Sequence, residues 1–282
     1  MKKFELTADK IKSNGVTLHR IKALIDFGDV KAGELGGYVE KETNLSQYGG
    51  AWVSDNACVC GNALVYGNAW LSGKALVYGN TQVFGEARVY ENAQVLGNAR
   101  IFDYARIFGN ARIYDNTRIF GNALVFEDAC VYGDTRICSD AKVSGNARID
   151  GSAYISGNAH IFGDSLVYGN AWVSDNALVC GNAEVYDDAE VCGNAEVYDD
   201  AEVYGNARVC SNADYIYLKG FGSHNRSTTI FRAKSGNICV SCGCFIGSLQ
   251  EFENKVKETH GNNKFAKEYL ALVEAAKIHF EV

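Results

Sequence analysis

The chain has 282 residues, ten cysteines and a formal net charge of −7. This mildly acidic balance gives no sign that a nucleic acid polymer is the partner. The sequence also shows neither a signal peptide nor an apolar run long enough to span a membrane. We therefore expect a cytoplasmic protein, and we expect its cysteines, including Cys192 and Cys210, to be reduced thiols.

Residues 1–49 do not repeat and are predicted to cap the structure that follows. Residues 3–9 and 17–27 have the pattern of strands, with turn residues at 13–15 between them. A pair of glycines at 36–37 indicates a second break. The end of a stacked structure exposes unpaired backbone groups, so a cap is expected there.

Residues 50–217 repeat one hexapeptide, Asn-Ala-x-Val-x-Gly, and from Asn56 onward no insertion or deletion breaks the frame. Small and β-branched residues two positions apart predict a short strand with one inward face, and Gly with Asn predicts a tight corner. Three such sides close a triangular turn about every eighteen residues, which is typical of a left-handed parallel β-helix, and about nine coils are expected. The chain contains no proline, as expected where each strand N–H bonds the next coil.

Residues eighteen apart stack in one column on the outside of such a helix. Arg100, Arg118 and Arg136 share a column, and the neighbouring column carries Phe102 and Phe120. Guanidinium groups beside aromatic rings suit an anionic planar ligand such as a nucleotide. Arg106 and Phe108 form an equivalent pair on another side, and Arg226 lies in the C-terminal part. The residues predicted to bind ligand are therefore Arg100, Arg118, Arg136, Arg106, Phe102, Phe120, Phe108 and Arg226.

Two other interpretations of these columns stay open. Aromatic ladders stabilise solenoids by themselves, and acidic residues at the corners can pair with the arginines. Those corner acids are Glu91, Asp103, Asp115, Glu127 and Asp128. Alternatively, the columns form an interface in a homo-oligomer, in which the arginines of one subunit meet an acidic ladder of another. The ladder consists of Glu184, Asp187, Asp188, Glu190, Glu196, Asp199, Asp200 and Glu202, with no base among them.

Residues 218–282 are predicted to form an α+β module. Strands are expected at residues 228–233 and 237–245. Ser248, followed three residues later by Glu251, forms a capping box for a helix that ends near Gly261. A second helix is expected to begin at about Lys264.

The cysteines of this module raise the question of a metal site. Cys239, Cys242 and Cys244 have irregular spacing for zinc, and a strand would turn Cys239 to the face opposite the other two. We therefore predict no metal and no cofactor. If a metal were held, Cys242, Cys244 and His260 would be its candidate ligands.

The hexapeptide pattern resembles that of left-handed β-helix acyltransferases. That resemblance implies a trimer with a general-base histidine and a loop that projects from the coils over an acyl donor. Here no loop interrupts the coils, and the only histidine of the repeat, His160, lies in an outward slot. A hexapeptide-repeat acyltransferase stays an alternative, but we predict that the protein is not an enzyme.

A closer resemblance covers the whole chain. The segments FELTADKIKSNGVTLHRIKALIDFGDVKAGELGGYVEKE before the repeats and NRSTTIFR with VSCGCFIGSLQEFENKVKETHG after them resemble uncharacterised hexapeptide-repeat proteins of phages and prophages, often named transferases. The resemblance implies a phage accessory protein in the host cytoplasm. We therefore expect a non-catalytic scaffold that sequesters an anionic small molecule, such as a host-defence nucleotide signal. The alternative is a structural or protein-binding scaffold that uses the acidic ladder.

Overall fold

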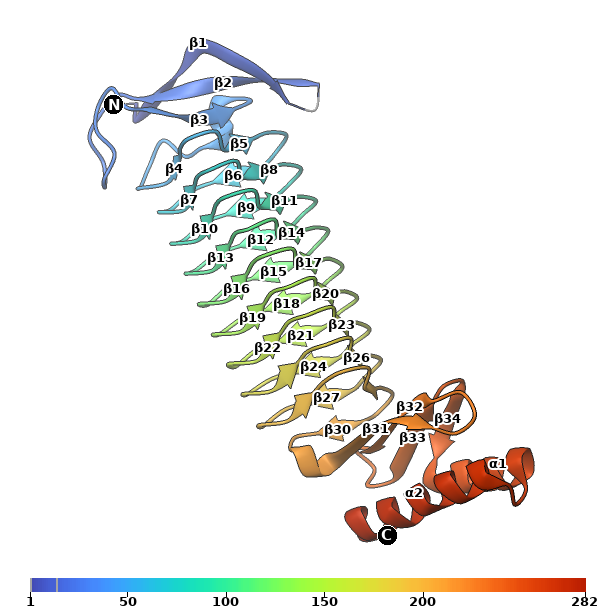
Figure 1. Cartoon of the computed structure of the whole chain (residues 1–282). Coiled ribbons are helices and arrows are strands. Elements are labelled where there is room, and N and C mark those ends of the chain that lie inside the picture. The colour runs from blue at the N-terminus through green and yellow to red at the C-terminus, as the bar shows by residue number, and fades with distance from the viewer. Residues whose placement is uncertain (1, 14) are drawn as a thin grey trace. The chain divides into compact units, whose positions relative to one another are not determined.

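The computed structural model describes residues 2–13 and 15–282 (Figure 1). The chain divides into two compact units, Met1–Gly157 and Asn158–Val282. Each unit is described by itself. The turn expected at residues 13–15 includes residue 14, which lies outside the described residues.

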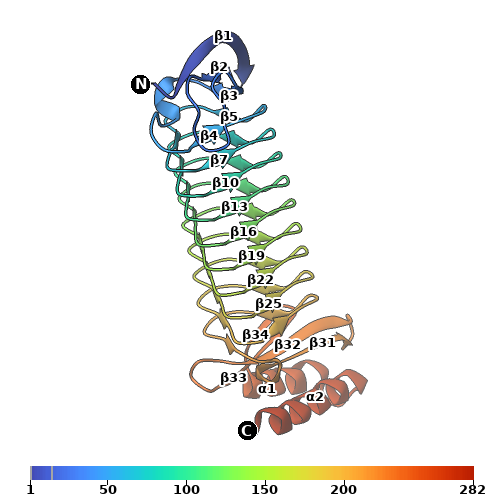
Figure 2. The same ribbon diagram turned by 90° about the vertical axis from the view of Figure 1, so that its left-hand side faces the viewer.

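The first unit is built almost entirely of very short strands (Figure 2). A 3-10 turn, η1 (Glu42–Asn44), links the longer opening strands to the series of two-residue strands. The strands of this unit are β1 (Phe4–Ser13), β2 (Val16–Ala23), β3 (Leu35–Val39), β4 (Trp52–Val53), β5 (Cys58–Val59), β6 (Leu64–Val65), β7 (Trp70–Leu71), β8 (Leu76–Val77), β9 (Gln82–Val83), β10 (Arg88–Val89), β11 (Gln94–Val95), β12 (Arg100–Ile101), β13 (Arg106–Ile107), β14 (Arg112–Ile113), β15 (Arg118–Ile119), β16 (Leu124–Val125), β17 (Cys130–Val131), β18 (Arg136–Ile137), β19 (Lys142–Val143), β20 (Arg148–Ile149) and β21 (Tyr154–Ile155).

Three parallel sheets run along this unit, one for each side of the triangle. Their orders are β3-β5-β8-β11-β14-β17-β20, β4-β7-β10-β13-β16-β19 and β6-β9-β12-β15-β18-β21. From β4 onward, strands eighteen residues apart pair in register, as Val89 does with Ile107. The inward alanines and aliphatic residues are fully buried; Ala99, Ile101 and Ile119 each have 0% exposure. The predicted parallel β-solenoid is therefore confirmed.

The N-terminal strands β1 and β2 form an antiparallel hairpin, and β2 also pairs antiparallel with β3. The predicted break at residues 36–37 is wrong, because both glycines lie inside β3. A Cβ on Gly36 would lie 2.5 Å from the Val53 carbonyl oxygen, and one on Gly37 would lie 2.5 Å from that of Ala57. Glycine is needed here for the close approach of β3 to the first complete coil, not for a turn.

The solenoid has about ten coils, one more than predicted. β3 already pairs in parallel with β5, and an isolated bridge joins Leu45 to Val65. The chain therefore follows a solenoid path before the repeat becomes regular, and the sequence pattern does not show this first coil.

The corners hold the coils together through side chains as well as backbone. Asp103 and Asp115 adopt left-handed backbone conformations, with φ of 56° and 54°. Their carboxylates accept hydrogen bonds from the amides of Gly121 and Gly133, each at 3.2 Å and one coil further on. Asparagines at a neighbouring corner position form amide ladders, as where the side-chain NH₂ of Asn98 donates to the next asparagine of its column at 3.0 Å.

The second unit begins with further two-residue strands of the same kind. Within it the sheets run β22-β25-β28, β23-β26-β29 and β24-β27-β30. An antiparallel sheet, β31-β32-β33-β34, and two helices follow. The elements are β22 (His160–Ile161), β23 (Leu166–Val167), β24 (Trp172–Val173), β25 (Leu178–Val179), β26 (Glu184–Val185), β27 (Glu190–Val191), β28 (Glu196–Val197), β29 (Glu202–Val203), β30 (Arg208–Val209), η2 (Asn212–Asp214), β31 (Tyr215–Phe221), β32 (Arg226–Arg232), β33 (Ile238–Cys242), β34 (Phe245–Ser248), α1 (Leu249–His260) and α2 (Lys264–Phe280).

Both predicted helices are present. The Ser248 hydroxyl accepts a hydrogen bond from the Glu251 amide at 3.2 Å, and the Glu251 carboxylate accepts one from the Ser248 amide at 2.8 Å, which confirms the capping box. Both helices pack on the four-stranded sheet around a core that includes Val240, Phe252 and Tyr269. None of the helices in the described part of the chain has the length and apolar character of a membrane span.

The expectation of reduced thiols is wrong for Cys192 and Cys210, which the structure joins by a disulfide. The two cysteines are eighteen residues apart, and their Cα atoms are 4.2 Å apart. They follow the paired strands β27 and β30, so the solenoid register itself stacks one thiol on the other.

Candidate functional site

The predicted arginine column is formed by three adjacent strands of one side. Arg100 pairs with Arg118, and Arg118 pairs with Arg136, on β12, β15 and β18. All three side chains are exposed, because the outward slot of a two-residue strand faces solvent. We call these three residues the arginine column.

The neighbouring rings form a continuous stack. Phe84 lies between Tyr66 and Phe102, with ring centroids 4.8 and 5.0 Å apart, and Phe102 stacks on Phe120 at 4.9 Å. The rings are parallel within 5°. The Arg100 guanidinium lies 5.5 Å from the Phe84 centroid and 5.9 Å from that of Phe102. Each ring therefore covers its neighbour's face, and no space is left between rings for a planar base.

The remaining candidates of the solenoid lie on a different side. Arg106 belongs to β13, which pairs with β10 and β16 rather than with the strands of the arginine column. Its neighbouring ring, Phe108, stacks between Tyr90 and Phe126 at 4.9 and 5.0 Å. The structure therefore separates Arg106 and Phe108 from the other predicted ligand-binding residues.

The corner acids do not pair with the arginine column. As described above, Asp103 and Asp115 bond to backbone amides of the next coil, and Glu127 does the same with the amide of Gly145 at 2.6 Å. Among the described residues, no ion pair includes any member of the arginine column. The alternative in which corner acids pair with these arginines is therefore not what the structure shows for the arginine column.

The acidic ladder, in contrast, is bonded within its own unit. The Ser241 hydroxyl donates to Glu202 at 2.6 Å, and the Tyr168 hydroxyl donates to Glu184 at 3.2 Å. Glu190 lies 3.7 Å from both Arg208 and Lys234. Tyr168 and Arg208 belong to the solenoid, whereas Lys234 and Ser241 belong to the C-terminal module, which the sequence pattern did not connect to the ladder.

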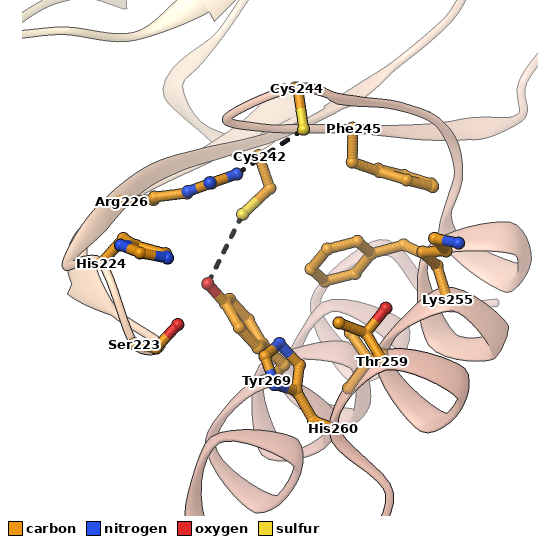
Figure 3. A pocket seen from close by; sticks show the side chains of 12 residues that line it. Ser223, His224, Arg226, Cys242, Cys244, Phe245, Lys255, Thr259, His260 and Tyr269 are labelled. Atoms are coloured by element: carbon orange, nitrogen blue, oxygen red, sulfur yellow. Dashed lines mark hydrogen bonds between the residues drawn. The ribbon is translucent and has the colours of Figure 1, made fainter.

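A cavity of about 410 Å³ lies in the C-terminal module (Figure 3). The turn between β31 and β32 brings Ser223 and His224 to it, and the turn between β33 and β34 brings Cys244. Helices α1 and α2 close the other side. We call this cavity the C-terminal pocket, and its lining residues are Ser223, His224, Arg226, Cys242, Cys244, Phe245, Phe252, Lys255, Val256, Thr259, His260 and Tyr269.

Rings form the apolar wall of the C-terminal pocket. Phe252 lies between Phe245 and Tyr269, at centroid distances of 5.2 and 5.5 Å. The His260 imidazole lies 5.9 Å from the Tyr269 ring, at an interplanar angle of 29°. The wall is built by residues from β34, α1 and α2, so it exists only once the helices pack on the sheet.

The polar groups of the pocket form a short chain of hydrogen bonds. The Thr228 hydroxyl donates to the Cys242 thiol at 3.1 Å, the thiol donates to the Tyr269 hydroxyl at 3.8 Å, and that hydroxyl donates to the Phe221 carbonyl at 3.3 Å. Burial, with smaller contributions from Cys242 and Glu268, raises the pKa of Tyr269 to about 12. The phenol therefore stays protonated at neutral pH and acts as a hydrogen-bond donor.

The pocket is also rich in basic groups. Arg226 and Lys255 contribute fixed positive charge, and His224 and His260 add charge when protonated. The Arg226 guanidinium donates to the Cys244 thiol at 3.8 Å. Among the described residues that line the pocket, none is acidic. Such a lining favours an anion with an apolar part.

Four residues that the sequence suggested for two separate chemistries meet in this pocket. Arg226 was a candidate for anion binding, and Cys242, Cys244 and His260 were weak candidates for metal binding. Within the described chain, the three-ligand cluster with donor atoms less than 4.8 Å apart is instead formed by Glu190 and the disulfide-bonded cysteines. Sequence reasoning missed Lys255, Phe245, Phe252 and Tyr269 as pocket residues, and of these only Phe252 and Tyr269 carried a signal, as apolar residues of the helices.

The fold and the repeat define a hexapeptide-repeat β-solenoid protein. A family model described as "YdcK Beta solenoid repeat" matches residues 57–73 and 105–119. A curated relative, "Uncharacterized acetyltransferase YdcK" of Escherichia coli (strain K12), is 41% identical over 56 residues. That match covers 20% of this chain and only 17% of the relative's length. The family-model match does not include the C-terminal pocket.

Proposed function

We propose that this protein is a non-catalytic scaffold whose C-terminal pocket binds an anionic small molecule with a planar apolar part. A nucleotide is one example of this class. The observation that carries the proposal is the pocket's composition: rings form one wall, basic side chains are among the remaining lining residues, and the described lining residues include no acid. Its volume of about 410 Å³ suits a small molecule.

The two parts of the ligand would be recognised by different groups. Arg226 can form a charge-assisted, bidentate contact with a phosphate or carboxylate. The faces of Phe252 and Tyr269 are partly taken by edge-on packing at 85°, so the apolar part of the ligand would lie against ring edges and Val256 rather than between parallel rings.

A binding role is favoured over acyl transfer by the state of the candidate groups. The Cys242 thiol is buried and already hydrogen-bonded on both sides. Tyr269, with its raised pKa, holds its proton and is a poor general base. In the solenoid, the His160 ring packs 4.6 Å from the Phe162 ring. The acetyltransferase name of the relative therefore supports only the shared repeat.

A protein-binding role for the acidic ladder has less support, because Glu184, Glu190 and Glu202 already have partners in their own unit. Sequestration of a nucleotide signal in a phage-infected host is the specific form of our proposal. It combines the ligand class that suits the pocket with the origin implied by the sequence resemblance. A homo-oligomer stays a prediction.

Calorimetric titration of the full chain with AMP, adenosine, acetyl-CoA and orthophosphate tests the proposal. We expect AMP to bind, and we expect Arg226→Gln to lower the affinity for AMP about tenfold or more, which corresponds to ~1.4 kcal/mol of binding free energy. Lys267→Gln removes one exposed charge from α2 outside the pocket and is the matched control, expected to leave binding unchanged. Equal affinity of the two variants would refute the assignment of the pocket.

Mass spectrometry of the ligand tests the non-catalytic part. AMP recovered after incubation and denaturation of the protein should be chemically unchanged. Tight binding of acetyl-CoA, followed by release of free coenzyme A, would overturn this part and restore the acyltransferase alternative.

A further inference from the structure

We infer that the arginine column is a second anion site, which binds a short linear chain of phosphates and does not recognise a base. This inference is independent of the C-terminal pocket, because it depends on a different set of side chains in the other unit. The shared chemistry is a triphosphate chain, whether free or as the tail of a nucleoside triphosphate.

The geometry of the column is linear and regular. Arg100, Arg118 and Arg136 occupy the same outward slot of three strands that pair in register. Successive strands lie about 4.8 Å apart, so the Cα atoms of the three arginines span about 10 Å. A chain of phosphate groups that lies along the column can place oxygens between successive guanidinium groups. Such groups are suited to bidentate contacts with phosphate.

Acidic side chains of the described residues do not neutralise the charges of the arginine column. Like charges directly opposite each other in a sheet are destabilising, and no described acid pairs with these arginines. The nearby carboxylates are held at the corners; Asp115 accepts from the Gly133 amide, and Asp134 accepts from the Asn116 amide at 2.9 Å. An anion along the column would therefore relieve repulsion that the fold leaves uncompensated.

The length of the ligand is limited by the ends of the column. Arg100 pairs on its other side with Gln82, and Arg136 pairs with Tyr154, so the basic residues stop after three coils. A long polyanion would pass beyond the arginines at both ends. The column therefore suits a short phosphate chain, and its corner acids exclude a broad positive field of the kind that binds nucleic acid polymers.

The neighbouring ring stack explains why a base is not recognised. Phe102 has a ring on each face, Phe84 at 5.0 Å and Phe120 at 4.9 Å. Beyond Phe120, the same slot is occupied by the buried Cys138, whose thiol donates to the Tyr154 hydroxyl at 3.2 Å. A base would meet ring edges only. The stack therefore supports the coils, and the predicted stacking of a nucleotide base on Phe102 or Phe120 is replaced by recognition of phosphate alone.

Calorimetric titration of the full chain with sodium tripolyphosphate, ATP, AMP and orthophosphate, at constant ionic strength, tests this inference. Tripolyphosphate and ATP should bind the column with affinities within about threefold of each other, since the base adds nothing. Arg118→Gln removes the central guanidinium and should lower the affinity for tripolyphosphate at least tenfold. Arg118→Lys keeps the charge but loses the planar, two-pronged guanidinium, so its loss of tripolyphosphate affinity should be intermediate.

Two controls separate this site from other charges. Lys142→Gln removes one exposed charge from another side of the solenoid and should leave tripolyphosphate binding within twofold of the wild type. The loss of affinity caused by Arg118→Gln should persist in an Arg226→Gln background, where any tripolyphosphate binding at the C-terminal pocket is weakened; Arg226→Gln alone weakens AMP binding if that pocket binds as proposed. The assignment of either site can therefore be refuted without refuting the other.

The variants should fold, because the outward slot of β15 is exposed, and circular dichroism verifies this. Equal tripolyphosphate affinity in wild type and Arg118→Gln would overturn the inference. So would an absence of tripolyphosphate binding, or AMP binding that depends on Arg118.

Discussion

Substitutions at Asp115 separate the two tasks of a corner residue. Its backbone is left-handed, with φ of 54°, and its carboxylate accepts a hydrogen bond from the Gly133 amide at 3.2 Å. An alanine in this conformation costs roughly 1–2 kcal/mol, and loss of a hydrogen bond costs about 0.5–1.5 kcal/mol. Because aspartate itself tolerates this conformation only in part, we expect Asp115→Ala to destabilise the solenoid by about 2 kcal/mol.

Two further substitutions at the same position isolate each contribution. Asp115→Gly removes the conformational cost but loses the acceptor and adds freedom to the unfolded chain, so it should cost about 1 kcal/mol. Asp115→Asn keeps an oxygen acceptor and tolerates the left-handed region, so it should cost less than about 1 kcal/mol. The expected order of destabilisation is alanine, then glycine, then asparagine.

Urea denaturation followed by circular dichroism measures the change in unfolding free energy, and hydrogen exchange of the Gly133 amide reports the local bond. That amide should exchange faster in the alanine and glycine variants than in the asparagine variant. Equal destabilisation by alanine and glycine would refute the conformational part of the reasoning. Unchanged exchange at Gly133 would refute the hydrogen-bond part.

Two more predictions concern the packing of the core and the pH at which Tyr269 ionises. Ile119→Ala empties a fully buried inward slot and should cost about 2–5 kcal/mol in urea denaturation, against about 0.5–1.5 kcal/mol for Ile119→Val; a smaller loss for alanine would contradict the close packing of the column. The raised pKa of Tyr269, about 12, means that the fold favours the neutral phenol. Its stabilising contribution is complete below the ordinary tyrosine pKa near 10 and is lost as pH rises towards 12. Burial also raises the pKa of Tyr186 to about 12, so the near-ultraviolet absorbance change near pH 12 should be smaller by one tyrosine in Tyr269→Phe than in the wild type.

The arginine column could be predicted from the sequence because the coil has a constant length. Residues eighteen apart must stack, so the neighbours of Arg118 follow from counting alone. What counting could not determine is how the corner acids are used. The carboxylate of Asp103 lies close in sequence to Arg100, yet it bonds the backbone of the next coil, because a left-handed corner turns the side chain along the solenoid axis.

The two errors in the first unit have a similar cause. Glycines at 36–37 are typical of a turn, and only the approach of β3 to the Val53 and Ala57 carbonyls shows why a side chain is excluded there. The extra coil likewise follows from a parallel pairing between β3 and β5 that no repeat in the sequence marks.

By itself, the sequence determined the parallel solenoid, its inward and outward slots and the capped C-terminal helices, because these depend on contacts at fixed short separations along the chain. The C-terminal pocket was decided only by tertiary structure. Arg226, Cys244 and His260 come from different elements with no common period, and they meet because α1 and α2 pack on an antiparallel sheet. Packing of an irregular module depends on the shapes of its side chains, which a periodic pattern does not encode.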